Sequence, residues 1–277
     1  MESDLNMPKA WLRYLLSVIL CVFAQAVSAV PYHHKALQKL QQSKQSKKAY
    51  SFVVAGDHRG GDPVLQKILN KARDYQPRFM LHTGDFTSAG KANEYASYLS
   101  YVQANRFPVL TALGNHDVLN QGRKRYQQAL GASDYSFQYG LDRYFVLDNS
   151  NYRVTSQQRK WLEAELKKPA RYRFVMMHMP PGNVIWFHAF TDGSQALMRL
   201  FEKYKVNYVF LGHIHIYDHM QFQGVHYVVS GGAGAPLYRM PLYFSDLGGA
   251  YYHFVLVQAS PKGIQLKVIP INFKQAR

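Results

Sequence analysis

The stretch Leu110-Thr111-Ala112-Leu113-Gly114-Asn115-His116-Asp117 indicates the fold of this chain, because an apolar run ends at a glycine that polar side chains follow. Upstream, Phe52-Val53-Val54-Ala55-Gly56 ends in the same way at Asp57, and Met80-Leu81-His82-Thr83-Gly84 ends at Asp85. Glycine lets the backbone turn off the tip of a strand, so the next side chain projects into the crevice above the sheet. The three stretches therefore predict strands whose polar ends lie together.

Two further runs of the same type follow in the second half of the sequence. Residues 174–177 end at His178, and residues 208–211 end at Gly212-His213-Ile214-His215. The five strand ends would bring aspartate, asparagine and histidine side chains to one place. These side chains offer oxygen and nitrogen ligands without sulfur, which suit divalent metal ions.

Amphipathic stretches between the apolar runs predict helices, at residues 63–75, 92–105, 122–130, 157–166 and 195–203. Strands that alternate with helices are typical of a parallel sheet, with any active site at the carboxyl ends of the strands. The last runs, at residues 225–230, 251–257 and 264–271, leave no room for helices, so we expect antiparallel strands there. The predicted fold class is α/β, a four-layer α/β/β/α sandwich of two mixed sheets with helices outside.

The composition is that of a globular protein, with 277 residues, 47% hydrophobic content and a single cysteine. It excludes a disordered chain, a collagen and a disulfide scaffold. The formal charge is +16, from 33 basic and 17 acidic residues. Such a surface attracts phosphate-rich ligands, which include an anionic phosphate-ester substrate, and we also consider contact with an anionic membrane or nucleic acid. The oligomeric state is left open.

Residues 1–29 are predicted to be a signal peptide. Lys9 and Arg13 precede an uncharged apolar stretch, and Val27-Ser28-Ala29 supplies small residues for cleavage after Ala29. We therefore expect a secreted or periplasmic protein. An uncleaved membrane anchor is one alternative, and lipidation at Cys21 is another. Cleavage would remove the only cysteine, which excludes thiol-based mechanisms in the mature chain.

Residues 30–50 are rich in lysine, glutamine and serine and contain no acidic residue. We interpret them as a basic, polar tether that is solvated, with contact to a membrane or polyanion as the alternative. No repeat and no second linker follows. We therefore expect one domain over residues 51–277.

The number of candidate ligands indicates more than one metal ion. A carboxylate that bridges two divalent ions would account for the number, and ions about 3.5–4 Å apart suit in-line attack on phosphorus. Two ions, two aspartates and a bridging hydroxide would leave a net charge of +1, which attracts phosphate. Neutral Asn115, in place of a third carboxylate, keeps this sum positive.

At these residues the chain resembles the calcineurin-like metallophosphoesterase superfamily. The family signature is an Asp block, Gly-Asp, Gly-Asn-His-Asp, a lone His and Gly-His-x-His, and all five blocks occur here in that order. The spacings between Asp57, Asp85, Asn115, His178 and His213 are 28, 30, 63 and 35 residues. Any single block is a weak signal, but the ordered set is highly specific.

The resemblance implies two divalent metal ions, with Mn, Fe, Zn, Co and Ni all suited to these ligands. It implies that one ion is held by Asp57, Asp85 and His215. The other would be held by Asp85 as the bridge, with Asn115, His178 and His213. His116 would assist the chemistry, and Asp117 would orient it.

The first block departs from the family pattern Asp-x-His, because Arg59 stands at the position of the histidine. A guanidinium has no lone pair for a metal. Either the first metal has one protein ligand fewer, or His58 reaches in, or the site binds this metal weakly. Arg59 would then clamp phosphate oxygens, or it would form a salt bridge, for example to Asp62. His188 is a candidate for the substrate mouth, with ordinary packing as the alternative.

The sequence thus predicts an exported, metal-dependent phosphoesterase in which a metal-bridging hydroxide attacks phosphorus. One alternative is a phosphodiesterase that acts on nucleotides, nucleic acid or phospholipid. The other is a polyanion-binding module that has lost turnover through the change at Arg59. The sequence does not choose between phosphomonoesters and phosphodiesters.

Overall fold

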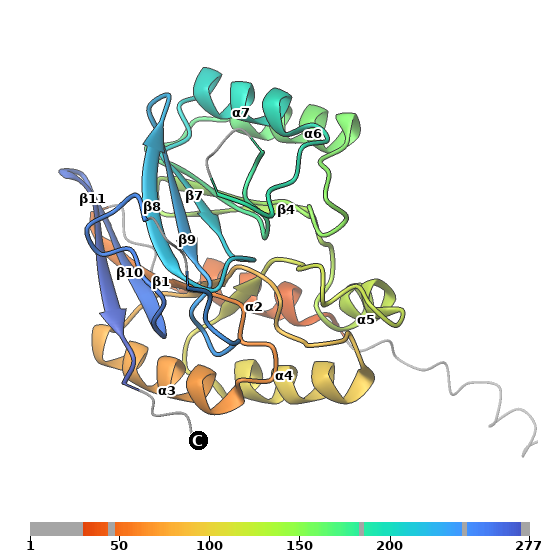
Figure 1. Cartoon of the computed structure of the whole chain (residues 1–277). Coiled ribbons are helices and arrows are strands. Elements are labelled where there is room, and N and C mark those ends of the chain that lie inside the picture. Colours follow the sequence, from red (N-terminus) through yellow and green to blue (C-terminus); the bar gives the residue numbers. More distant parts are fainter. Residues whose placement is uncertain (1–29, 44–47, 183–185, 240–242, 273–277) are drawn as a thin grey trace, which may run out of the picture. The chain divides into compact units, whose positions relative to one another are not determined.

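Two β-sheets pack face to face in the structure, a computed structural model that describes residues 30–43, 48–182, 186–239 and 243–272 (Figure 1). The predicted signal peptide lies outside the described residues. Within these residues, no helix has both the length and the apolar character needed to cross a membrane.

The first sheet has five strands in the order β11-β10-β1-β2-β3. Its strands are β1 (Tyr50–Ala55), β2 (Met80–His82), β3 (Val109–Thr111), β10 (His253–Ser260) and β11 (Gly263–Pro270). The strands β1, β2 and β3 are parallel, whereas β10 is antiparallel to both β1 and β11. This sheet is therefore mixed, as predicted.

The second sheet has six strands in the order β4-β5-β6-β7-β9-β8. They are β4 (Tyr135–Tyr139), β5 (Asp142–Val146), β6 (Arg173–Met176), β7 (Tyr208–Leu211), β8 (Tyr217–Phe222) and β9 (Val225–Ser230). The inner strands β5, β6, β7 and β9 are parallel, and the edge strands β4 and β8 are antiparallel. The sequence analysis did not predict β4 or β8, because neither has the continuous apolar run of a buried strand.

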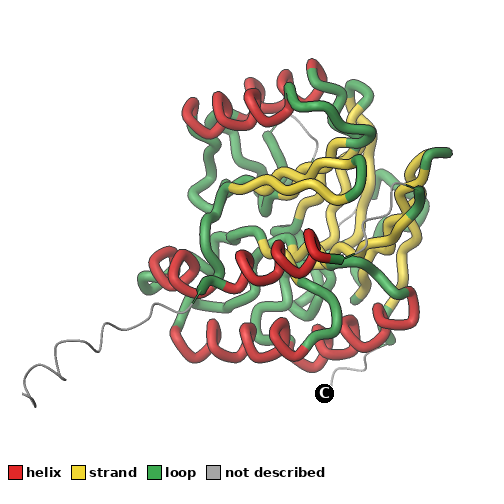
Figure 2. Tube along the Cα trace, turned by 180° about the vertical axis from the view of Figure 1, so that it is seen from behind, coloured by secondary structure: helices red, strands yellow, loops and turns green. Residues whose placement is uncertain are grey.

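Helices cover the outer faces of both sheets (Figures 1 and 2). The helices α3 (Asp62–Ala72) and α4 (Ala92–Ala104) pack on the first sheet, and the short 3-10 helix η1 (Arg73–Tyr75) extends α3. The helices α6 (Ser156–Leu166) and α7 (Ser194–Lys203) pack on the second sheet. The helix α5 (Gly122–Ala129) follows the third ligand block. The predicted four layers are confirmed.

The side chains of each strand alternate between two cores. In β1, Phe52 and Val54 face the second sheet, whereas Val53 and Ala55 pack with the outer helices. Aromatic rings dominate the layer between the sheets, and Phe52 lies 5.2 Å from Phe79 and 5.3 Å from Phe174 between ring centroids. The tightly packed layer holds the strand tips in fixed positions.

Residues 30–43 are not a solvated tether, which corrects that part of the domain prediction. They contain the helix α2 (Tyr32–Gln42), whose residues His33, Ala36 and Leu40 are buried. The helix lies along β3, the edge strand of the first sheet, and the Thr111 N–H donates to His33 Nε2 over 3.1 Å. The lysines had suggested a hydrated segment, but they lie between buried positions spaced by three and four residues.

Candidate metal centre

The predicted ligands lie directly after the carboxyl ends of parallel strands in both sheets. Asp57 follows β1, Asp85 follows β2, Asn115 follows β3, His178 follows β6, and His213 and His215 follow β7. The sandwich therefore brings all five strand ends to one place, as the sequence predicted.

Close contacts at this place require glycine at the strand tips. A Cβ atom on Gly114 would lie 2.2 Å from Asp85 Oδ1, and one on Gly212 would lie 2.3 Å from Asp57 Oδ2. A Cβ on Gly84 would lie 2.8 Å from His178 Nδ1. The glycines thus permit the ligands of one strand to approach the backbone of the next.

The ligand atoms are near enough to share metal ions. His178 Nε2 lies 3.1 Å from Asn115 Oδ1 and 3.4 Å from Asp85 Oδ1, and His213 Nδ1 lies 3.3 Å from His178 Nε2. On the other side, His215 Nε2 lies 3.7 Å from Asp57 Oδ1. Ligand atoms of Asp57, Asp85 and His178 all lie within 4.8 Å of one another.

Two of the histidines are held by backbone carbonyl groups behind them. His178 Nδ1 donates to Thr83 O over 2.9 Å, and His215 Nδ1 donates to Pro236 O over 2.7 Å. This directs Nε2 of each ring toward the carboxylates. Such hydrogen bonds from the far nitrogen are typical of metal-ligating histidine.

The carboxylates are buried, and their charge needs compensation. Burial raises the pKa of Asp57 well above its usual value. Burial also acts to raise the pKa of Asp85, but the charges of His178 and His116 outweigh it and lower the pKa. Burial acts to lower the pKa of His178, whereas Asp85 and Asp57 raise it to about 9. A positive charge at this place is therefore strongly favoured.

The donor set fits divalent cations. Burial lowers the pKa of His213 to about 3 and that of His215 to about 4, so both imidazoles are neutral and have a lone pair. Carboxylate, amide and imidazole ligands around a buried anionic pair are what a borderline divalent ion requires. A cation would supply the charge that His178 otherwise carries, and would release that ring as a neutral ligand.

His116 lies at the rim of this centre. Its Nδ1 donates to Ser88 O over 2.8 Å, and its backbone N–H donates to Asp85 Oδ1 over 2.9 Å. Its Nε2 lies 4.0 Å from Asp85 Oδ2, and 26% of the side chain is exposed. The ring therefore has a fixed orientation, with Nε2 available for proton transfer.

Asp117 does not orient His116, which corrects the role predicted from the resemblance. Its carboxylate accepts hydrogen bonds from Asp85 N, Gly114 N and Thr87 N, each over 2.8 Å, and from Thr87 Oγ1 over 2.9 Å. The carbonyl of Ser88 holds His116 instead. Asp117 thus joins the loops that follow β2 and β3, and it acts on the site through the backbone of Asp85.

His58 does not take the place of the missing ligand. Its ring stacks on Tyr98 with centroids 5.4 Å apart, and its Nδ1 lies 3.3 Å from His82 Nε2. Its Nε2 lies 3.6 Å from Asp62 Oδ1. Its two ring nitrogens therefore face His82 of β2 and Asp62 of α3.

Arg59 has no salt bridge to Asp62, whose other oxygen accepts hydrogen bonds from Ser97 and Tyr101. The backbone of Arg59 has a φ of 39° and is held on both sides of the Cα atom. Its N–H donates to Asp85 O, and its carbonyl accepts from Ser88 Oγ. Its Nε is buried and, among the described residues, has no hydrogen-bond partner. Burial dominates the pKa values of Asp57 and His215, and the charge of Arg59 acts to lower both.

Aromatic side chains surround the two histidines of the last block. Tyr238 stacks on His215 with centroids 4.4 Å apart, and Tyr152 and His188 each lie edge-on to His213 at 6.1 Å. His188 is exposed, and its place at the substrate mouth stays a prediction. The sequence analysis missed Tyr152 and Tyr238, because both stand in loops without a repeating pattern.

Asn149 was also missed, although it supports the centre directly. Its Oδ1 accepts hydrogen bonds from the N–H groups of His178 and Met179, and its Nδ2 donates to Met179 O. The position directly after β5 in Leu147-Asp148-Asn149 was the available signal, since it is a further strand end with polar residues.

Comparisons with known proteins agree with the geometry. The chain is 25% identical to purple acid phosphatase 5 of Arabidopsis thaliana over 203 residues, covering 68% of this chain and 49% of the relative. It is 29% identical to the glycerophosphodiester phosphodiesterase GpdQ of Enterobacter lignolyticus (strain SCF1) over 192 residues, covering 62% and 66%. The chain thus spans about half of the first relative and about two thirds of the second.

A solved structure shares the fold. The purple acid phosphatase PPD1 from seeds of yellow lupin (Lupinus luteus) aligns with a TM-score of 0.65 at 19% identity, covering 81% of this chain and 52% of that one. The sequence model of the calcineurin-like phosphoesterase family matches residues 50–217, which contain every ligand described above. This chain belongs to the calcineurin-like phosphoesterase family.

Proposed function

We propose that this protein hydrolyses phosphate esters at a centre of two divalent metal ions. The observation that carries the proposal is the convergence of Asp57, Asp85, Asn115, His178, His213 and His215 from five strand ends. Asp85 would be the bridging carboxylate, which its proximity to both His178 and Asp57 supports. Bound metal ions would act as Lewis acids on a phosphoryl oxygen and would lower the pKa of an attacking water.

The residues of the chain would divide the remaining tasks. His116 Nε2 would hold or donate a proton at the oxygen of the leaving group, while the Ser88 carbonyl keeps its Nδ1 protonated. The Arg59 guanidinium, which has a buried Nε without a partner among the described residues, would bind phosphoryl oxygens. Tyr152, Tyr238 and His188 would line the entrance through which the ester reaches the metal ions.

The relatives carry names of two ester classes, a phosphatase and a glycerophosphodiester phosphodiesterase. Positive charge from Arg59 beside the ligands favours a dianionic phosphomonoester over a monoanionic diester, since the attraction grows with the charge of the substrate. We therefore propose phosphomonoesters as the preferred class. Comparison of phenyl phosphate with bis-phenyl phosphate on the metal-loaded protein would test this preference.

Asp85→Ala tests the metal centre. The variant should lose hydrolysis of phenyl phosphate and should bind fewer than two equivalents of Mn²⁺, because the bridging carboxylate is shared. Asp74→Ala is the matched control, since Asp74 is exposed and forms an ion pair with exposed Lys71. Two tightly bound equivalents in Asp85→Ala would refute the bridging role. A wild-type protein that binds metal but hydrolyses no phosphate ester would instead indicate a binding module.

We further propose that the protein is exported and that cleavage occurs after Ala29. The support is the charge and apolar pattern of residues 1–29, together with the start of α2 at Tyr32, directly after the proposed cleavage site. Sequencing of the amino terminus of the mature protein should find Val30 as the first residue. An intact amino terminus in a membrane fraction would favour the uncleaved anchor.

A further inference from the structure

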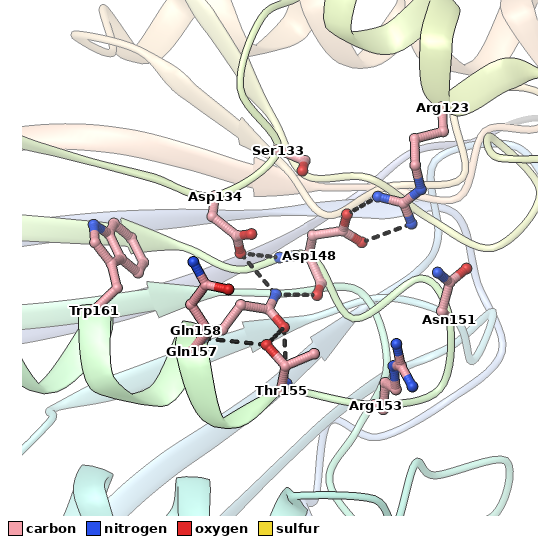
Figure 3. Close-up of a pocket in the computed structure, with 10 residues that line it drawn as sticks. All are labelled: Arg123, Ser133, Asp134, Asp148, Asn151, Arg153, Thr155, Gln157, Gln158 and Trp161. Carbon is pink, nitrogen blue, oxygen red and sulfur yellow. Dashed lines mark hydrogen bonds and ion pairs between the residues drawn. The ribbon is translucent and has the colours of Figure 1, made fainter.

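A polar cavity of about 500 Å³ lies between α5 and the beginning of α6, and none of the tasks above uses it (Figure 3). Arg123 of α5 forms one wall, and Asp148 and Asn151 of the loop after β5 form another. The first turn of α6 and Trp161 complete the lining.

One loop contacts both the cavity and the metal centre. In the loop of residues 148–153, Asn149 holds the backbone of His178, and Tyr152 lies against the ring of His213. The side chains of Asp148, Asn151 and Arg153 in the same loop line the cavity. One short loop therefore connects the residues that line the cavity with those that contact the candidate ligands.

Some of the polar side chains in the lining already form hydrogen bonds and an ion pair with one another. Arg123 forms an ion pair with Asp148, and its NH2 group donates to Ser150 Oγ over 2.7 Å. Gln158 donates to Asp134 Oδ1 over 2.9 Å and to Asp148 O over 2.7 Å (Figure 3). These bonds fix the shape of the cavity without a ligand.

Other polar side chains in the lining are available to a ligand. Among the described residues, the side chains of Ser133, Asn151, Gln157 and Arg153 take part in no hydrogen bond or ion pair. They offer donors and acceptors at short spacing, and Trp161 adds an aromatic face. Such a combination suits a ligand with several hydroxyl groups, whose C–H surface packs on an aromatic ring.

The charges of the lining exclude a second phosphate as the preferred occupant. Two arginines and two aspartates line the cavity, so their formal charges cancel, whereas the chain as a whole carries +16. Apart from Trp161, the lining side chains are polar or charged, so the cavity does not suit a lipid tail. A neutral, hydroxyl-rich group fits both observations.

We propose that this cavity binds the alcohol part of the phosphate ester and that this alcohol is a sugar or another polyol. The inference rests on the proposed function, because the phosphate of the same molecule would lie at the metal centre. It goes further by assigning a substrate class and by assigning Asn151 and Gln157 to its recognition.

The test compares two esters on the metal-loaded full chain. Asn151→Ala/Gln157→Ala should lower kcat/KM for glucose 6-phosphate about tenfold or more, mainly through KM, because two hydrogen-bonding groups are lost. Phenyl phosphate has no hydroxyl groups to recognise, so its kcat/KM should stay within about twofold. Both positions are exposed, and a thermal melt will confirm that the fold is intact. Gln127→Ala is the matched control, an exposed glutamine on α5 outside the cavity.

Equal losses with both esters, or no loss with either, would overturn the inference. A loss confined to adenosine monophosphate would assign the cavity to a nucleoside instead. If the wild type hydrolyses neither ester, the proposed function fails, and titration with glucose 6-phosphate followed by tryptophan fluorescence tests the cavity alone. Weaker binding in the double variant would then support the cavity assignment, and identical titrations would reject it.

Discussion

Several residues of the metal centre have backbone conformations that residues with side chains rarely adopt. Asp57, Asp85 and His213 have φ values of 62°, 52° and 68°. Each such position costs of order 1–3 kcal/mol, so the surrounding contacts must enforce it. The hydrogen bonds from His213 N to both oxygens of Asp57 provide one such constraint.

Arg59 is the residue at which the chain departs from the family pattern. Kinetics can distinguish a phosphate-binding role of this residue from a structural one. If the guanidinium binds phosphate in ground and transition states alike, Arg59→Ala should raise KM about tenfold or more with a smaller change in kcat. Metal content should not change, because arginine is not a ligand. Steady-state kinetics and metal analysis measure both. Unchanged kinetic constants with a lower Tm would show a structural role.

Arg59→His rebuilds the usual first block and tests the missing ligand. If this ligand limits occupancy of the first metal site, the variant should bind that metal more tightly in a competition with a chelator. Loss of the phosphate contact would at the same time raise KM. An unchanged metal affinity would refute the idea of a vacant ligand position.

Asp117 joins two loops through bonds that no other residue can replace. Asp117→Ala would leave buried N–H groups of Asp85, Gly114 and Thr87 without an acceptor, at a cost of about 3 kcal/mol or more. This should lower Tm by roughly 6–12 °C, whereas His116→Ala should lower kcat by a factor of about 10²–10⁴ with little effect on Tm. Calorimetry and kinetics on both variants distinguish the roles. A normal Tm in Asp117→Ala would show that these hydrogen bonds do not stabilise the fold.

At the scale of elements, α2 closes the open edge of the first sheet. The N–H groups of Val109 and Thr111 on β3 donate to Tyr32 Oη and His33 Nε2, each over 3.1 Å. An exposed edge strand invites pairing with other chains, and a helix that covers it removes this risk. The helix is thus part of the folded domain.

The contact between His33 of α2 and Thr111 of β3 should weaken in acid. Burial lowers the pKa of His33 to about 3, against an ordinary value of 6.5 in the unfolded chain. The unfolded state therefore binds more protons below pH 6.5, and stability should fall by about 1 kcal/mol per pH unit until about pH 3. His33 faces the rings of Tyr126 and Tyr135, and no acidic side chain among the described residues is paired with it.

The comparison that checks this is urea unfolding of the wild type and His33→Gln between pH 7 and 4. Glutamine can accept the Thr111 hydrogen bond but does not titrate, so its stability curve should be flatter. His34→Gln is the control, because His34 is exposed on the same helix. Parallel curves for the wild type and His33→Gln would show that α2 does not depend on a neutral His33.

At the scale of the whole molecule, the charge of +16 should steer anionic substrates toward the metal centre. The value of kcat/KM should fall as salt rises from about 0.1 M to 1 M, while the Debye length shrinks from about 10 Å to 3 Å. The fall should be steeper for a dianionic monoester than for a monoanionic diester, and metal content must be constant throughout. A flat profile for both esters would assign the charge to another role.

The candidate metal ligands and the order of the elements were predictable from the sequence, because both are local features. An apolar run of four to six residues that ends in glycine and a ligand specifies a strand, its direction and its tip. The order of the five blocks then specifies which strand ends converge. The mixed character of the sheets followed from the short turns between the last strands.

Only the tertiary structure decided which residues surround the candidate ligands and support them. The partners of Asp117, the rings of Tyr152 and Tyr238, and the packing of α2 on β3 all join segments that are distant in the sequence. No local pattern encodes such contacts, because they depend on the packing of loops whose sequences have no periodicity. The sequence determined the candidate ligands, whereas long-range packing decided which residues position them and which line the cavity.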